Sequence, residues 1–81
     1  MRITVRFFAI ARDQAGVSQS ILHLEPGATV ETAAKALAEQ FPKLATLPPR
    51  VGYAVNQSYV DAKTVLREGD ELAVIPPVSG G

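Results

Sequence analysis

The sequence has no cysteine among its 81 residues and a single histidine, His23. The lack of cysteine excludes disulfides, thiolate metal ligands and thiol catalysis, so any sulfur chemistry of this chain cannot use a side-chain thiol. His23 stands in a stretch that alternates like a strand, and no second histidine is present to build a metal site with it. A solvated or packed imidazole is the better interpretation of His23 than a base or a ligand. We therefore expect no bound metal and no cofactor held by this chain.

An excess of charge of one sign is also missing. Eight basic and eight acidic residues give a formal net charge of zero, without the dense Lys and Arg stripe that a phosphate backbone requires. No window approaches the roughly 18 uninterrupted apolar residues of a membrane span. The apolar start of the chain is broken by Arg2 and Arg6 and lacks the cleavage pattern of a signal peptide. These absences predict a cytoplasmic protein that binds neither nucleic acid nor membrane.

Motifs of enzymes are few. The six glycines do not form a phosphate-binding P-loop, and no nucleophile elbow surrounds any serine. The carboxylates Asp61, Glu68, Asp70 and Glu71 gather at expected turns, where acids are usually solvated. With 47% hydrophobic and 20% charged residues, the chain has the composition of one small globular domain. Whether the chain is itself an enzyme is left open by these residues.

The first half of the sequence predicts two strands and a helix. Residues 2–9 alternate as a strand with Ile3, Val5 and Phe7 toward the core, and residues 20–25 form a second strand after a polar turn over residues 12–19. We expect these two strands to form a hairpin. A helix then follows from the N-cap Thr29 to Pro42. Its apolar stripe consists of Val30, Ala33, Ala34, Leu37, Ala38 and Phe41.

The second half predicts a loop with at most one helical turn over residues 43–49, and then three strands. These cover residues 51–55, 59–60 and 71–75, with turns at residues 56–58 and 68–70. The order β-β-α-β-β-β indicates an α+β fold in which a mixed sheet wraps around one main helix. The first and last strands should pair in parallel at its centre, and Leu72 and Val74 should pack on the helix face of Val30, Ala34, Leu37 and Phe41. Residues 1–75 would be the domain and residues 76–81 an extended tail.

The tail is the most informative segment, because the sequence ends on Gly80-Gly81. Two terminal glycines arise by chance in about one chain in 200. The stiff pair Pro76-Pro77 upstream cannot donate to a ladder, so it ends the last strand and directs the tail outward. A chain that stops on Gly-Gly offers its own α-carboxylate as a reactive group.

A docking surface is predicted from the parity of the strands. Phe8 lies opposite to Ile3, Val5 and Phe7, and Ile75 lies opposite to Leu72 and Val74, so Phe8 and Ile75 should share the face that the helix leaves uncovered. Tyr59 would join them, with Arg6 and Arg50 at the rim, since interface cores are commonly apolar with a polar border.

Several segments together resemble one known family, the small subunits of molybdopterin synthase, which are ubiquitin-like sulfur carriers with the β-grasp fold. They are Phe7-Phe8-Ala9 with Arg12 and Gly16, Val55-Asn56-Gln57 with Val60-Asp61, Gly69-Asp70-Glu71, and the ending Ile75-Pro76-Pro77-Val78-Ser79-Gly80-Gly81. The Pro-Pro pair favours this branch, because Gly-Asp-Glu and Gly-Gly also occur in thiazole-pathway carriers and small ubiquitin-like modifiers. The resemblance covers residues 2–81.

The resemblance implies a mechanism. A ubiquitin-activating-type adenylyltransferase would use ATP to convert the Gly81 carboxylate to an acyl-adenylate, and sulfur would replace AMP to give a thiocarboxylate. The tail from Pro76 through Pro77, Val78, Ser79 and Gly80 would enter the large catalytic subunit, with Phe8, Tyr59 and Ile75 docked on that subunit in a heterotetramer. Four residues beyond Pro77 span about 13 to 14 Å, enough to reach a buried site. The chain would be a cosubstrate, with catalytic residues in the large subunit.

Two alternatives remain open from the residues alone. One is a sulfur carrier for thiazole or another thio-cofactor, which would keep the same tail chemistry and differ in its partner. The other is a ubiquitin-like protein modifier or a plain interaction module, in which Gly81 would form an isopeptide or no bond at all.

Overall fold

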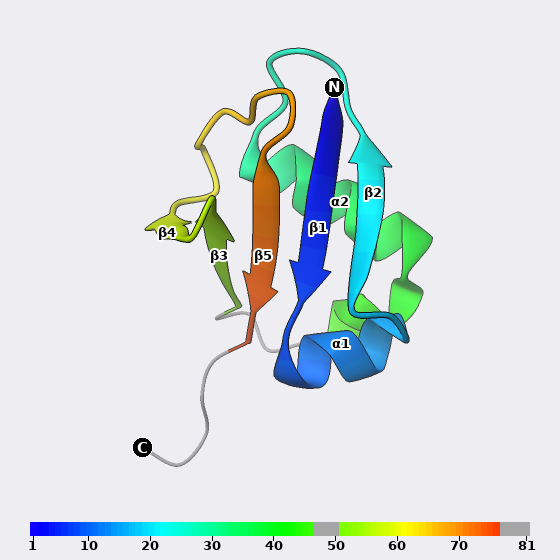
Figure 1. Ribbon diagram of the computed structural model, residues 1–81. Helices are drawn as coiled ribbons and strands as arrows, with labels where there is room; N and C mark the ends of the chain where they lie inside the picture. The colour runs from blue at the N-terminus through cyan, green and yellow to red at the C-terminus, as the bar shows by residue number, and fades with distance from the viewer. Residues whose placement is uncertain (47–50, 77–81) are drawn as a thin grey trace.

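The computed structural model describes residues 1–46 and 51–76, and in these ranges the chain forms a five-stranded mixed sheet with one helix across a face and a shorter helix at the end of the sheet (Figure 1). In chain order the elements are β1 (Arg2–Phe7), α1 (Ala9–Ala15), β2 (Gln19–His23), α2 (Val30–Gln40), the 3-10 helix η1 (Pro42–Thr46), β3 (Gly52–Val55), β4 (Ser58–Val60) and β5 (Glu71–Ile75). The strand order across the sheet is β2-β1-β5-β3-β4.

The first and last strands lie side by side at the centre of the sheet, as predicted. β1 and β5 are parallel, with Val5 opposite Leu72 and Phe7 opposite Val74, and every other pairing in the sheet is antiparallel. A parallel neighbour requires a crossover, and α2 supplies it by packing on one face of the sheet. This arrangement is the predicted α+β, ubiquitin-like β-grasp fold.

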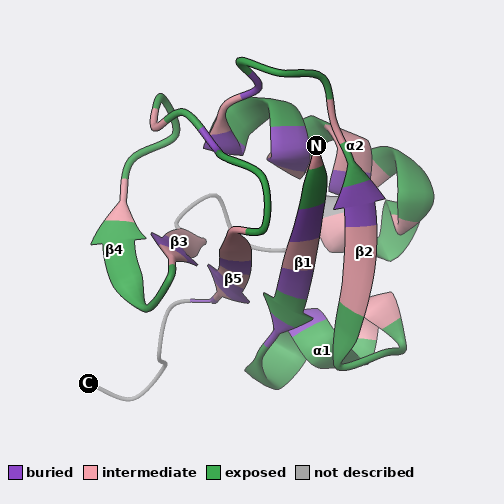
Figure 2. Ribbon diagram, turned by 45° about the horizontal axis from the view of Figure 1, so that its top comes forward, coloured by how far each residue is buried: buried purple, intermediate pink, exposed green. Residues whose placement is uncertain are grey.

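The core fills the space between α2 and the sheet (Figure 2). Alternation along β1 buries Ile3, Val5 and Phe7, and the same alternation buries Leu72 and Val74 on β5. The Phe7 ring meets the Phe41 ring edge to face, with centroids 5.4 Å apart. Leu66, in the segment before β5, is also fully buried, and the sequence pattern did not single it out.

Helix α2 begins as predicted, because the Thr29 side chain accepts a hydrogen bond from the Thr32 backbone at 3.3 Å. The Thr32 hydroxyl in turn accepts from the Thr29 backbone, which completes a capping box. The buried face differs from the predicted one: Ala33 is fully buried between Val30 and Leu37, whereas Ala34 stays partly exposed. The apolar stripe of the helix is wider than the surface that contacts the sheet. The sequence alone therefore could not determine how α2 is rotated about its own axis.

The predicted polar turn over residues 12–19 is wrong, because α1 occupies much of this segment. Ala11, in the first turn of α1, is fully buried. The helix ends at Gly16, which takes the left-handed conformation (φ 80°) and donates a hydrogen bond to the Arg12 carbonyl at 2.9 Å. β1 correspondingly ends at Phe7, before the predicted residue 9. β1 and β2 are antiparallel neighbours as expected, but a helix joins them where a hairpin turn was predicted. One buried alanine is too weak a periodic signal to reveal this helix.

Candidate functional site

The sheet face opposite α2 carries a row of four side chains that runs across the strands. The pairing register places Arg6 of β1 beside Ala73 of β5, Ala73 beside Ala54 of β3, and Ala54 beside Tyr59 of β4. Small residues therefore occupy the middle of the row and large ones its two ends. The result is a trough with an alanine floor.

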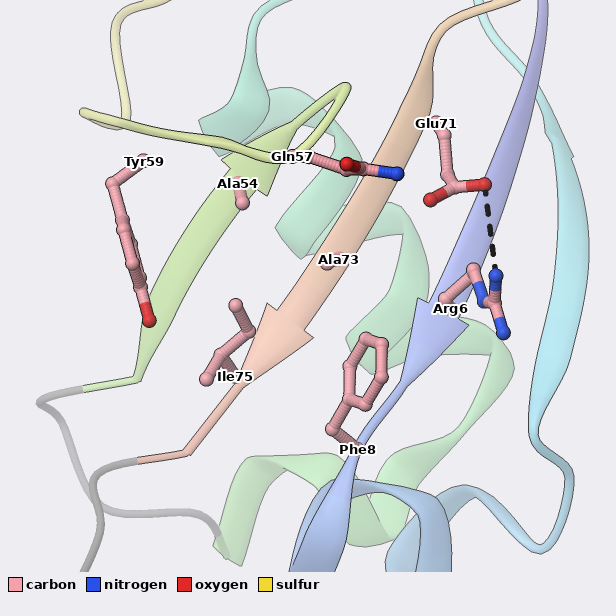
Figure 3. Close-up of a pocket in the computed structure, with 8 residues that line it drawn as sticks. All are labelled: Arg6, Phe8, Ala54, Gln57, Tyr59, Glu71, Ala73 and Ile75. Carbon is pink, nitrogen blue, oxygen red and sulfur yellow. Dashed lines mark ion pairs between the residues drawn. The ribbon is translucent and has the colours of Figure 1, made fainter.

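This trough is a groove of about 350 Å³, drawn in Figure 3. Its lining residues are Arg6, Phe8, Ala54, Gln57, Tyr59, Glu71, Ala73 and Ile75. The groove brings together all three predicted docking residues, since Phe8 and Ile75 lie at one end and the Tyr59 ring forms the opposite wall from Phe8. Phe8 is 43% exposed and Tyr59 is 75% exposed, so a large apolar area faces solvent here.

Local backbone geometry aims these side chains. Phe8 follows the end of β1, and its backbone N–H still donates to the Val74 carbonyl at 3.3 Å, which keeps the ring on the outer face. The next residue, Ala9, takes a positive φ of 51°, and this bend turns the chain into α1 directly after Phe8. On the other wall the Tyr59 ring lies against Gly52, where an added Cβ would be 3.6 Å from Cε1. The groove is thus shaped by backbone as well as by side chains.

A charged pair borders the groove. Arg6 Nη1 lies 3.9 Å from Glu71 Oε2, and the Arg6 guanidinium carbon lies 5.9 Å from the centroid of the Phe8 ring. Both side chains of the ion pair are substantially exposed, so the pair is worth at most about 1 kcal/mol in the free chain. Arg6 is at the rim as predicted, whereas Arg50, the other predicted rim residue, falls outside the described residues.

The groove lies where the tail leaves the domain. β5 ends at Ile75, which lines the groove, and Pro76 directly after it is buried, so the strand stops at the predicted proline. Pro77, Val78, Ser79, Gly80 and Gly81 lie outside the described residues. The groove and the start of the tail are therefore neighbours in space as well as in sequence.

Other chemistry has little support within residues 1–46 and 51–76. No group of three or more His, Asp or Glu side chains in these ranges could hold a metal ion. His23 is exposed at the end of the edge strand β2, which agrees with the solvated one of the two states, solvated or packed, that were expected for it. Burial raises the pKa of Tyr53, whose ring packs against the core. In the same ranges, no helix is long and apolar enough to cross a membrane.

Sequence reasoning missed four residues of the groove: Ala54, Gln57, Glu71 and Ala73. The alanines carry no chemical signal of their own, and they matter because two separate strands place them next to each other. Gln57 stands in the tight turn between β3 and β4, where Asn56 and Gln57 both have positive φ. Alternation along β5 predicts Ala73 on the face of Ile75 and extends to Glu71, but it could not show which residues lie across from them.

Comparison with known proteins gives close relatives over the whole chain. The ThiS family matches residues 5–81. The molybdopterin synthase sulfur carrier subunit of Chlamydomonas reinhardtii is 39% identical, with 100% of each chain covered. The human molybdopterin synthase sulfur carrier subunit is 34% identical over 99% of this chain and 94% of its own length.

Solved structures share the fold. SAMP1 from Haloferax volcanii, a small archaeal modifier protein, superposes with a TM-score of 0.91 at 28% identity and full coverage of both chains. A putative molybdopterin converting factor subunit 1 from Pyrococcus furiosus gives 0.88 at 29% identity, covering 96% of this chain and 99% of the other. A complex of subunits 1 and 2 of the molybdopterin-converting factor from Helicobacter pylori has the same fold, with a TM-score of 0.71, 23% identity and full coverage of both chains.

The match to residues 5–81, the end-to-end identity with sulfur carrier subunits and the β-grasp fold agree with one another. This chain belongs to the ThiS family.

Proposed function

We propose that this chain is the sulfur carrier of a molybdopterin synthase and that the Gly81 carboxylate carries the sulfur. The observation that supports this most strongly is the combination of the Gly-Gly ending with full-length identity to sulfur carrier subunits of that enzyme. The groove next to the tail provides a place for a partner to hold the domain. The side chains of the described residues offer no alternative reactive centre.

The chemistry follows from the weakness of a carboxylate as an acyl donor. A Gly81 carboxylate oxygen attacks the α-phosphorus of ATP on a ubiquitin-activating-type adenylyltransferase, which releases pyrophosphate and leaves an acyl-adenylate. A sulfur donor then displaces AMP, and the product is a Gly81 thiocarboxylate, a strong nucleophile. Its sulfur attacks an electrophilic carbon of the pterin precursor and displaces an oxygen leaving group from it, and water then cleaves the acyl carbon–sulfur bond to restore the carboxylate. We propose the cytoplasm as the location of this reaction.

The proposed partner is the large catalytic subunit, with two copies of each subunit in a heterotetramer. Phe8, Tyr59 and Ile75 dock on that subunit while the tail reaches its active site. Glycines at the last two positions carry no Cβ and can pass a narrow tunnel, and Pro76-Pro77 limits the freedom of the unbound tail, which lowers the ordering cost on docking. Groups that hold the substrate phosphate belong to the partner.

The decisive experiment removes or displaces the reactive carbon. Deleting Gly81, or adding one alanine after it, shifts the terminal carboxylate by about 3.5 Å along an extended chain, which is far outside attack geometry. We expect no dithiolene product in a reaction reconstituted with the adenylyltransferase, a sulfur source, the large subunit and the pterin precursor. The folded domain should melt at an unchanged temperature. Product formation at the normal rate by either variant would refute the carrier mechanism.

A protein modifier is the second candidate, because a small archaeal modifier protein has a TM-score of 0.91 with this chain. Mass spectrometry of the chain purified from its native cells separates the two functions. Replacement of oxygen by sulfur adds about 16 Da to the free chain, whereas conjugation leaves a C-terminal remnant of this chain linked through Gly81 to a lysine of another protein. The same preparation, offered separately to the thiazole and molybdopterin pathways, identifies the sulfur acceptor.

A further inference from the structure

Arg6 is a cation at the rim of a mainly apolar groove. Its guanidinium carbon lies 5.9 Å from the Phe8 ring centroid, and its paired residue on the neighbouring strand β5 is Ala73. The contact with Glu71 at 3.9 Å is longer than the 2.7–3.2 Å of a hydrogen bond. Among the described residues, no hydrogen bond is donated by the Arg6 side chain, so water satisfies its donors in the free chain.

Docking removes that water. A partner that covers Phe8 and Ile75 also covers the guanidinium between Phe8 and Glu71. The Glu71 carboxylate, at 3.9 Å, can accept from only part of the five-donor guanidinium, and the apolar side chains beside it supply no further acceptor. A buried donor without a partner weakens binding strongly, so a surface that binds here must bring its own acceptor to Arg6. The planar fork of a guanidinium is matched best by the two oxygens of a carboxylate.

We infer that Arg6 is a specificity-determining residue of this face and that the protein partner presents a carboxylate to it, beside the apolar group that fills the alanine-floored trough. This inference rests on the proposed function, in which a second subunit covers the groove. Because Ile75, the last residue of β5, lines the same groove as Arg6, pairing at Arg6 also fixes how the partner lies relative to the end of β5.

The charge of Glu71 predicts the direction in which a substitution there changes partner binding. Its carboxylate already lies near Arg6, so it repels an incoming partner carboxylate and would attract a partner cation. The Glu71 backbone is held independently, because its N–H donates to Asn56 Oδ1 at 3.1 Å and its carbonyl accepts from the Asn56 N–H at 2.9 Å. Glu71→Gln therefore removes the charge without moving the strand.

The test measures binding of the purified large catalytic subunit (the second subunit) from the same organism, by calorimetry at low and high salt. Arg6→Gln should weaken binding about 10-fold or more, and Arg6→Lys, which keeps the charge but loses the fork, should weaken it about 3-fold. Glu71→Gln should tighten binding by about 2- to 5-fold, since a repulsive charge is gone. The salt dependence of binding should shrink in Arg6→Gln.

Two variants with the same charge changes serve as controls. Arg67→Gln lies in the exposed segment before β5, and Glu39→Gln lies on α2 behind the sheet; both should bind within about 2-fold of the unaltered chain, because exposed charges away from an interface matter little. Thermal melting checks that every variant is folded.

The outcomes separate the two levels of the proposal. If the unaltered chain binds the second subunit, but the Arg6 and Glu71 variants bind as their control variants do, the inference is overturned. The proposed function is then unaffected. Weaker binding by Glu71→Gln also overturns it, since the partner would then present a cation. Failure of the unaltered chain to bind the second subunit overturns the proposed function and the inference with it.

Discussion

Truncation of Phe8 to alanine tests the docking groove most directly. Full burial of a phenylalanine side chain removes about 150–250 Å² of its accessible surface from water. Phe8 is 43% exposed in the free chain, so docking would cover roughly 65–110 Å² of it, which at about 25 cal/mol per Å² corresponds to about 1.6–2.7 kcal/mol. Phe8→Ala should therefore weaken binding of the large subunit by about 15- to 100-fold. Phe8→Asp should weaken it further, because it places a charge where an apolar anchor belongs.

The assay is calorimetric titration of the large subunit with each variant, next to a thermal melt of the variant alone. Val65→Ala is the matched control, because Val65 is 56% exposed and lies outside the groove, in the bridge to Thr29. The control should bind like the unaltered chain, and neither variant should lose its fold, since Phe8 is not part of the buried core. A loss of less than about 3-fold for Phe8→Ala would show that the partner does not use this face.

Three further changes address the fold. Leu37→Ala removes three carbons from a side chain that is 2% exposed and should lower the free energy of unfolding by about 2 to 5 kcal/mol in urea titrations; the matched loss in Ile10→Ala, where the side chain is largely exposed, should be far smaller, and equal losses would contradict the packing of α2. Burial raises the pKa of Tyr53 above 10.0 in the folded chain, so the unfolded chain loses this proton first. The contribution of Tyr53 to the free energy of unfolding should thus be constant below about pH 10 and fall at higher pH, so Tyr53→Phe should reduce the loss of stability above pH 10; an identical pH profile would contradict the assignment. Gln57→Gly relieves a φ of 72° in the β3–β4 turn and should stabilise the chain by about 0.5–1 kcal/mol. A lower melting temperature would contradict this prediction, because it would mean that the Gln57 side chain stabilises the turn by more than the backbone strain costs.

Much of the fold could be predicted because alternation and caps are local properties. The period-two pattern of β1 and β5 identified the buried faces of both strands, and Thr29 marked the start of α2. The pattern failed where few side chains carry the signal. α1 buries a single alanine completely, and Leu66 reaches the core from an irregular segment that no periodicity describes.

Some features of the candidate site could likewise be predicted from local sequence, and others could not. The sequence alone determined the Gly80-Gly81 ending, the prolines that stop β5, the absence of any thiol and the outward parity of Phe8 and Ile75. These are properties of the order of residues, so no other segment has to be known. Together with the resemblance to molybdopterin synthase small subunits, they predict a carrier whose reactive group would be its own terminus.

Only the tertiary structure decided what surrounds Phe8 and Ile75. The alanine floor exists because the parallel pairing of β1 with β5 and the antiparallel pairing of β5 with β3 place Ala73 between Arg6 and Ala54. The approach of Arg6 to Glu71 likewise joins residues 65 positions apart in the chain. Strand order and register arise from the packing of the whole sheet on α2, and no local pattern encodes which side chains meet across three strands.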